Sequence, residues 1–297
     1  MLAREVLERI RKWGKAERIE VRRNSHIFSR EGKRVLARAR EGEHSVIEFH
    51  PEKPLGDALL LFIPGFTGAG DNLGILAKEL AYMGMEAHVL QLPGQGGPMW
   101  KEYDRERVVE HIAQYAKKVA GNRPVLLVGH SLGGELVKYV AEKLKQDGIV
   151  VDTVHLAPAG RRTSLRYRIG DWFMKTPVGA RLAIRFTLRG DLKGLRKGFD
   201  PRAVQAYGKM LQEETMDPRG GAFWRGTYLY GSKDNLVPHQ GTLWRYREGI
   251  PQQKGQRIIT VRGDHDITRD LTKTIAREIV RAARRLETSW KRRKYDA

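Results

Sequence analysis

The strongest constraint on the fold is a regular alternation of apolar strand-like segments and helix-like segments in the first half of the chain. DALLLFIPGF begins with the apolar stretch Ala58–Ile63, and another apolar stretch, Val125–Val128, leads into GHSLGG. Strands that are apolar at every position are typical of parallel sheets covered on both faces. Between them, NLGILAKELAYMGM places Leu73, Leu76 and Leu80 on one helical face. The alternation predicts an α/β fold with a mostly parallel sheet flanked by helices.

The 297 residues divide into a core and an insertion. The alternation stops near Ala159, and the following segment is rich in arginine and aromatic residues, without a clear strand. GTYLYGSKD and QRIITVRGDHD then read as strands again, and apolar residues about four apart predict a long terminal helix. We therefore expect an N-terminal amphipathic helix over 1–17, an α/β core over 18–159 and 225–297, and a helical insertion over 160–224.

The segments before the alternation are shorter. Leu2, Val6, Ile10 and Trp13 have near-helical spacing among arginines and lysines, which predicts an amphipathic helix. Such a helix either docks on its own domain or lies on an anionic membrane. Two strands are expected next, near Lys33–Arg40 and Ser45–His50.

Composition excludes several kinds of chemistry. The chain has no cysteine, so disulfides, thiolate metal sites and cysteine nucleophiles are absent.

The net charge of +20 fits an anionic partner, a host that uses charge-rich surfaces, or simply a well-solvated surface. We find no RNA-binding aromatic motif, zinc-finger spacing or HExxH pair, and so expect no nucleic-acid partner. Without a secretory signal or a membrane-spanning apolar run, a cytoplasmic protein is expected.

Three residues that suit catalysis follow predicted strands, in the order Ser131, Asp234 and His265. Functional groups in an open parallel sheet gather at the carboxyl ends of the strands. Residues 129–133, GHSLG, match the nucleophile-elbow pattern G-x-S-x-G between a strand and a helix. The pattern alone also fits a tight turn with an incidental serine, but the two distant partners favour a nucleophile, an orienting acid and a general base.

The glycines of GHSLG have a physical reason. A serine on a very sharp turn presses the positions two before and two after it against the strand and helix, which leaves no space for side chains. Asp264 and Asp266 flank His265 and are rival orienting acids, ranked below Asp234 because sequence neighbours rarely face the same imidazole edge. His130 directly follows the strand and is not expected to be the base.

The ordered set FIPGFTG, LPGQGG, GHSLGG, GSKDNLVP and GDHD resembles the α/β-hydrolase superfamily, most closely its carboxylesterase and monoacylglycerol-lipase-like branch. The resemblance implies an α/β-hydrolase fold with Ser131 as nucleophile, His265 as base and Asp234 as orienting acid. It also implies an oxyanion hole built from the backbone N–H groups of Leu132 and Phe66. Proline replaces the histidine that usually precedes Gly65, which leaves the donor in place but changes how the loop is braced.

The resemblance further implies that the insertion after the sixth strand of the hydrolase fold is a helical cap over the site. Between Arg161 and Arg225 it holds 15 Lys or Arg against 6 Asp or Glu, so the cap and the N-terminal helix are candidates for contact with an anionic membrane surface. We expect a monomer or homodimer, and serine hydrolysis of this type needs no cofactor or metal. Residues expected to line an acyl pocket, or simply to pack the cap on the core, are Phe66, Trp172, Phe173, Met174, Phe186 and Met210.

The leading functional hypothesis is a serine hydrolase for a small-molecule carboxylic ester, such as a medium-chain ester or a monoacylglycerol. The same three residues also suit a lysophospholipase, a thioesterase, an amidase or an acyltransferase. A serine at position 131 disfavours a haloalkane dehalogenase, which uses a carboxylate there. A hydrolase fold that only binds an anionic ligand or surface is the alternative from another class.

Overall fold

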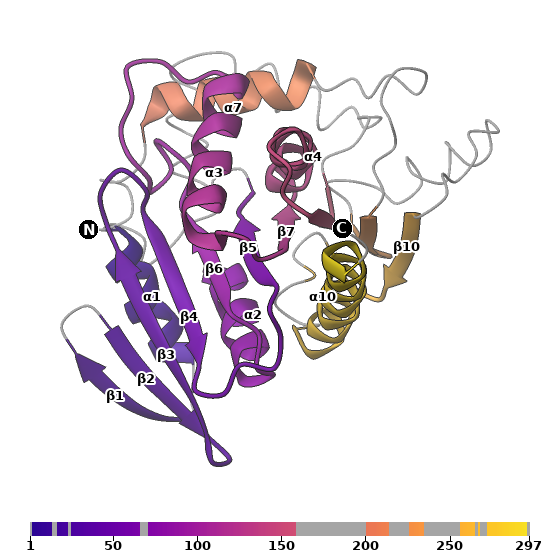
Figure 1. Ribbon diagram of the computed structural model, residues 1–297. Coiled ribbons are helices and arrows are strands. Elements are labelled where there is room, and N and C mark those ends of the chain that lie inside the picture. The colour runs from indigo at the N-terminus through magenta and orange to yellow at the C-terminus, as the bar shows by residue number, and fades with distance from the viewer. Residues whose placement is uncertain are drawn as a thin grey trace.

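A ten-stranded sheet forms the centre of the computed structural model among the residues that it describes (Figure 1). The described residues are 2–13, 17–22, 25–65, 71–158, 200–213, 226–234, 256–264, 267 and 272–295. Within them the elements are α1 (Leu2–Trp13), β1 (Arg18–Arg22), β2 (Ser25–Arg30), β3 (Lys33–Arg40), β4 (Val46–Pro51), β5 (Leu59–Ile63), α2 (Asp71–Tyr82), β6 (Ala87–Leu90), α3 (Arg105–Ala120), β7 (Val125–His130), α4 (Leu132–Gln146), β8 (Val151–Leu156), α7 (Pro201–Glu213), β9 (Gly226–Gly231), β10 (Gln256–Val261) and α10 (Thr272–Tyr295).

The strand order across the sheet is β1-β2-β3-β4-β6-β5-β7-β8-β9-β10. The six strands from β6 to β10 in this order pair in parallel. Each of the first four is antiparallel to its neighbour, and β4 is antiparallel to β6. The mostly parallel sheet confirms the prediction from the alternating segments. Strands β1 and β2 add to the two strands expected before residue 58, and the charged sequence RIEVR of β1 suits its place at the sheet edge.

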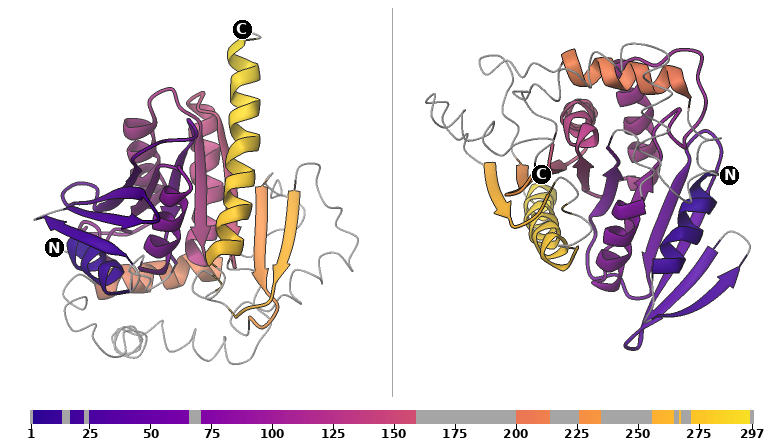
Figure 2. Two further views of the ribbon diagram at one scale, coloured as in Figure 1. Left: turned by 90° about the horizontal axis from the view of Figure 1, so that it is seen from below. Right: turned by 180° about the vertical axis from the view of Figure 1, so that it is seen from behind.

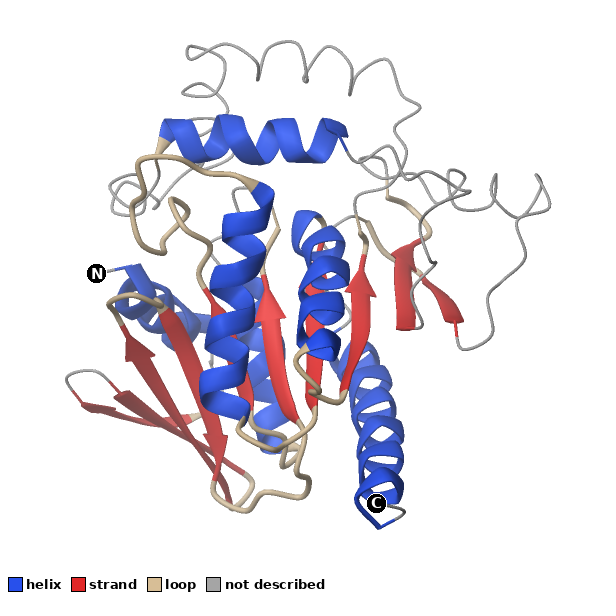
Figure 3. Cartoon of the chain, turned by 45° about the horizontal axis from the view of Figure 1, so that its top comes forward, coloured by secondary structure: helices blue, strands red, loops and turns tan. Residues whose placement is uncertain are grey.

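Two apolar clusters cover the two faces of the sheet, as the fully apolar strands predict. Along β5, Leu60 and Phe62 join the cluster formed with α1, α2 and α10, whereas Leu59, Leu61 and Ile63 join the cluster formed with α3 and α4. Figure 3 shows α3 and α4 in front of the sheet. Burial of each such side chain contributes about 1.5–3 kcal/mol, so the central strands are a rigid base for the loops at their carboxyl ends.

Helix α1 packs its apolar face on the domain itself. Ala3, Val6, Leu7 and Ile10 are buried in the cluster that also contains residues of α2. The exposed side chains of the helix include Arg4 and Lys12. The apolar face that would enter a bilayer is therefore occupied by protein.

The C-terminal helix α10 extends beyond the body of the sheet (Figure 2). Its first turns bury Ile275, Ile279 and Leu286, whereas its last turn carries Arg292, Arg293 and Lys294. Among the residues described, no helix combines the length and the apolar character that crossing a bilayer requires.

The insertion expected over 160–224 is described only at residues 200–213, which contain α7; its other residues lie outside the described part. Helix α7 crosses the ends of α3 and α4 (Figure 1). The buried Tyr207 hydroxyl donates to the Pro93 carbonyl at 2.9 Å, and the Asp200 N–H donates to the Gly94 carbonyl at 2.8 Å. These bonds fasten α7 to the loop that follows β6.

Candidate active site

Ser131 occupies a sharp turn between the end of β7 and the first residue of α4. Its backbone has φ 51° and ψ −116°, a region that residues with a side chain rarely adopt. Such a conformation costs about 1–3 kcal/mol and persists only where the surrounding structure imposes it. The Ser131 N–H donates to the Leu156 carbonyl of β8 at 3.0 Å. The turn thus holds a strained, partly exposed serine at the carboxyl end of a central strand.

Gly129 and Gly133 permit this turn because neither position has space for a side chain. A Cβ atom on Gly129 would lie 2.6 Å from the backbone nitrogen of Gly134, and one on Gly133 would lie 2.6 Å from the carbonyl oxygen of Pro64. The obstacles are backbone atoms of α4 and of the chain at the end of β5, which cannot move aside as a flexible side chain would. The crowding inferred from the sequence is therefore present on both sides of Ser131.

Leu132 begins α4 and is 1% exposed. The first N–H groups of a helix have no partner within it and lie at the positive end of its dipole, where they stabilise negative charge. The loop after β5 passes close to this turn, because a Cβ atom on Gly65 would lie 3.0 Å from the Cβ of Ser131. Phe66, the other expected oxyanion donor, lies outside the described residues, so its role stays a prediction.

Asp234 lies in the turn that follows β9 and is 5% exposed. Its N–H donates to the Gly231 carbonyl at 3.2 Å, and the neighbouring Lys233 N–H donates to the Gly263 carbonyl at 2.7 Å. These bonds join the loops after β9 and β10. His265 lies outside the described residues, but Asp264, which precedes it, is exposed and its carbonyl lies against Gly231. The structure thus brings the ends of the two strands together, as the sequence order requires.

His155 in β8 braces the turn from behind, a role that the sequence reasoning missed. Its Nδ1–H donates to the Gly134 carbonyl at 2.6 Å, and its Nε2 accepts from the Thr153 hydroxyl at 2.9 Å. The ring stacks on Tyr228 with centroids 4.1 Å apart. Burial lowers the pKa of His155 to about 3, against the smaller opposing effect of its bond to Gly134. A neutral imidazole therefore fixes the first turn of α4; its only sequence signal is a histidine within the apolar strand VDTVHLAP.

Two further polar side chains lie beside the carboxyl end of β6. Gln91 and Gln95 are completely buried, and within the described part of the chain their amide groups have no hydrogen-bond partner. The Gln91 N–H donates to the Ser45 carbonyl at 2.8 Å, which holds the start of the LPGQGG loop. Nothing in the periodicity of this segment distinguishes the two glutamines.

Of the residues expected to line an acyl pocket, the structure describes Met210. It is 4% exposed and packs in the apolar cluster shared with α3 and α4. Phe66, Trp172, Phe173, Met174 and Phe186 lie outside the described residues, and their part in a pocket stays a prediction.

A parallel sheet that presents a strained serine at this turn places the protein in the class of α/β hydrolases. The chain belongs to the alpha/beta hydrolase family, whose model matches residues 60–286. No curated protein sequence matches the chain.

Solved structures of low sequence identity share the fold. A thermophilic esterase from Thermogutta terrifontis has a TM-score of 0.58 at 15% identity, over 90% of this chain and 100% of that chain. The haloalkane dehalogenase DatA from Agrobacterium tumefaciens has a TM-score of 0.61 at 13% identity, over 86% and 98%. A lipase-esterase related protein from Clostridium acetobutylicum has a TM-score of 0.58 at 17% identity, over 81% and 99%. The fold is therefore one on which several hydrolytic reactions occur.

Proposed function

We propose that this hydrolase cleaves carboxylic esters through a serine acyl-enzyme intermediate. The observation that carries the proposal is the strained backbone of Ser131, at φ 51°, between two glycines that have no space for a side chain. Strain of this kind is retained where a reactive group must be presented in one orientation. A medium-chain ester or a monoacylglycerol is the substrate class proposed.

In the proposed mechanism, the Ser131 Oγ attacks the ester carbonyl while His265 takes its proton. The negative charge of the tetrahedral intermediate is stabilised by the N–H of Leu132, at the start of α4, and by that of Phe66. The intermediate then expels the alcohol, which receives the proton from His265. A water molecule, deprotonated by the same imidazole, hydrolyses the acyl-serine and releases the acid.

Asp234 is proposed to hold the imidazole in the correct tautomer and to stabilise the imidazolium. Its burial and the bonds between its loop and the loop that ends at Asp264 support this role. Asp264 is exposed, which makes it a weaker rival than the sequence alone suggests.

The identity of residue 131 separates this proposal from the chemistry of the dehalogenase neighbour. Serine supplies a neutral hydroxyl that needs a base, whereas a haloalkane dehalogenase uses a carboxylate at this position. Thioester, amide and acyl-transfer reactions use the same serine chemistry, so a panel of ester, thioester and amide substrates separates them from ester hydrolysis.

The proposal is tested by labelling the protein with a fluorophosphonate and by measuring the hydrolysis of aryl esters, thioesters and amides of increasing acyl length. We expect stoichiometric labelling and a preference for esters, both lost in Ser131→Ala. Asp234→Asn should lower kcat by about 10⁴-fold, because the tautomer of the base is no longer held.

Ser289→Ala is the matched control, since Ser289 is exposed on α10, and it should label as the wild type does. Absence of both labelling and turnover in the wild type would overturn the proposal of an enzyme. Undiminished labelling of Ser131→Ala would place the nucleophile elsewhere.

A further inference from the structure

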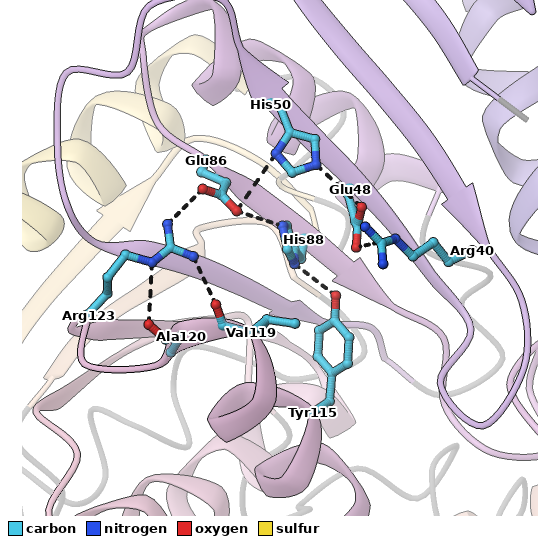
Figure 4. Close-up of polar contacts among 9 residues, drawn as sticks. All are labelled: Arg40, Glu48, His50, Glu86, His88, Tyr115, Val119, Ala120 and Arg123. Carbon is cyan, nitrogen blue, oxygen red and sulfur yellow. Dashed lines mark hydrogen bonds and ion pairs between the residues drawn. The ribbon is translucent and has the colours of Figure 1, made fainter.

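Two Glu-x-His segments lie side by side on paired strands. Glu48-Phe49-His50 belongs to β4, and in Glu86-Ala87-His88 the glutamate directly precedes β6, which begins at Ala87. The antiparallel register pairs Glu48 with His88 and Phe49 with Ala87. Because side chains alternate along a strand, both carboxylates and both imidazoles lie on one face of the sheet, where Figure 4 shows them converging.

The two imidazoles approach one carboxylate oxygen. The Glu86 Oε1 lies 3.0 Å from the His88 Nε2 and 3.8 Å from the His50 Nδ1. One ligand atom from each of the three residues lies within 4.8 Å of the other two. In a tetrahedral zinc site with bonds of about 2.1 Å, neighbouring ligand atoms are about 3.4 Å apart. The two distances at Glu86 bracket this separation.

In each imidazole, the nitrogen that does not face Glu86 has a hydrogen-bond partner that orients the ring. The His50 Nε2 lies 3.3 Å from the Glu48 Oε2; a carboxylate only accepts, so this nitrogen carries the proton and the Nδ1 lone pair faces Glu86. The His88 Nδ1 lies 2.8 Å from the Tyr115 hydroxyl. A hydroxyl both donates and accepts, so Tyr115 also bonds to the tautomer that carries its proton on the His88 Nδ1 and leaves the Nε2 lone pair free for a metal.

Arginines hold the other oxygens of both carboxylates. Arg123 donates to the Glu86 Oε2 at 2.7 Å and also to the carbonyls of Val119 and Ala120 at the end of α3. Arg40 lies 2.8 Å from the Glu48 Oε1. Hydrogen bonds from His88 and Arg123 lower the pKa of Glu86 to about 2 against the cost of its burial. Glu86 is therefore ionised at neutral pH, with Oε1 turned toward the imidazoles.

We propose that His50, Glu86 and His88 bind one divalent transition-metal ion of the zinc type. Two imidazoles and one carboxylate suit Zn²⁺ and its neighbours rather than Mg²⁺ or Ca²⁺, which take oxygen ligands. The His88 side chain is 3% exposed, whereas those of His50 and Glu86 are 32% and 23% exposed. The site therefore opens toward solvent on one side, where water completes the coordination.

The position of the site sets its role. Glu86 lies at the start of β6, whereas Ser131 follows the end of β7, and both strands are parallel to β5 between them. The two sites thus lie at opposite ends of the sheet. The ion joins the antiparallel strand β4 to the parallel strand β6 and stabilises the sheet without taking part in hydrolysis, so this proposal is independent of the proposed function.

The test uses the full chain without a histidine tag, stripped of metal with a chelator and titrated with Zn²⁺ by calorimetry. We expect one ion per chain. Zn²⁺ at a hundredfold excess over Kd should raise Tm by about 4 °C. Co²⁺ should give visible absorption bands of the intensity typical of four-coordinate sites.

His50→Gln removes a half-exposed ligand with little packing and should weaken Zn²⁺ binding at least about tenfold, as should Glu86→Gln. Glu52→Gln, an exposed carboxylate just beyond β4, is the matched control and should bind as the wild type does. His50→Gln should leave fluorophosphonate labelling unchanged. Equal binding by the wild type and His50→Gln, or no binding by the wild type, would overturn the proposal.

Discussion

The buried imidazole of His155 should make the free energy of unfolding depend on pH. Burial lowers its pKa from 6.5 to about 3 in the folded protein, so the ring stays neutral there while the unfolded chain takes up a proton below about pH 6.5. The unfolded state then binds more protons, and the free energy of unfolding falls as the pH falls. The loss begins near pH 6.5 and continues until the folded protein itself titrates near pH 3.

The magnitude follows from the pKa difference. Each pH unit between the two pKa values is worth about 1.4 kcal/mol, so acidification to about pH 5 should cost about 2 kcal/mol through His155 alone. His111 acts in the same direction, because burial and the nearby His44 lower its pKa to about 4. The carboxyl groups of Glu48 and Glu86 have lowered pKa values and add their own loss only at more acidic pH.

The assay is urea unfolding at about pH 7.5 and about pH 5, followed by tryptophan fluorescence and circular dichroism. In His155→Gln the pH-dependent loss should shrink by about 2 kcal/mol, whatever the variant's stability at the higher pH. Thr153→Val is the matched control: it removes the hydroxyl that donates to the His155 Nε2 but keeps the titrating ring. A pH-dependent loss in His155→Gln equal to that of the wild type would refute the reasoning.

Two further substitutions test the packing. Gly129→Ala should destabilise the protein by about 1–3 kcal/mol in thermal unfolding and abolish fluorophosphonate labelling, because the new Cβ meets the backbone of Gly133. The control is Gly208→Ala in α7, where nothing lies within 4 Å of the new atom; it should be neutral or slightly stabilising. Lys78→Met should cost about 3 kcal/mol in urea unfolding. It removes the cation 2.7 Å from the Glu17 carboxylate, whose side chain is 5% exposed, and leaves only the more distant Arg30, at 3.8 Å. A Lys78→Met, Glu17→Gln double variant should recover part of that loss, and no recovery would show that packing, not charge, sets the cost.

The fold was predictable from local patterns because its strands are short and unambiguous. The apolar runs before FIPGF and GHSLG have no polar face, and a strand of that kind is stable only between two layers of helices. β1 and β2 escaped prediction because charged residues at a sheet edge give a weak apolar alternation. Their existence depends on pairing with β3, which the segments themselves do not encode.

Part of the candidate site could likewise be predicted from short segments, and part could not. GHSLG between a predicted strand and a predicted helix indicated the sharp turn at Ser131, whereas the Pro64 carbonyl that leaves no space for a side chain at Gly133 belongs to a distant segment. Asp234 and Asp264 could be ranked only by their burial in the folded chain, where one is 5% exposed and the other lies at the surface. His155, at a distance in sequence from the turn that it braces, gave no signal beyond its presence in an apolar strand.

By itself, the sequence determined the α/β class, the family and the turn that presents Ser131, since each leaves a recognisable pattern within short segments of the chain. Only the tertiary structure decided that α1 covers its apolar face with the domain, that His155 supports the first turn of α4, and that two Glu-x-His segments meet across β4 and β6. These features depend on strand register and on the packing of distant segments. These contacts contribute free energy only once the sheet is assembled, so no local pattern of residues predicts them.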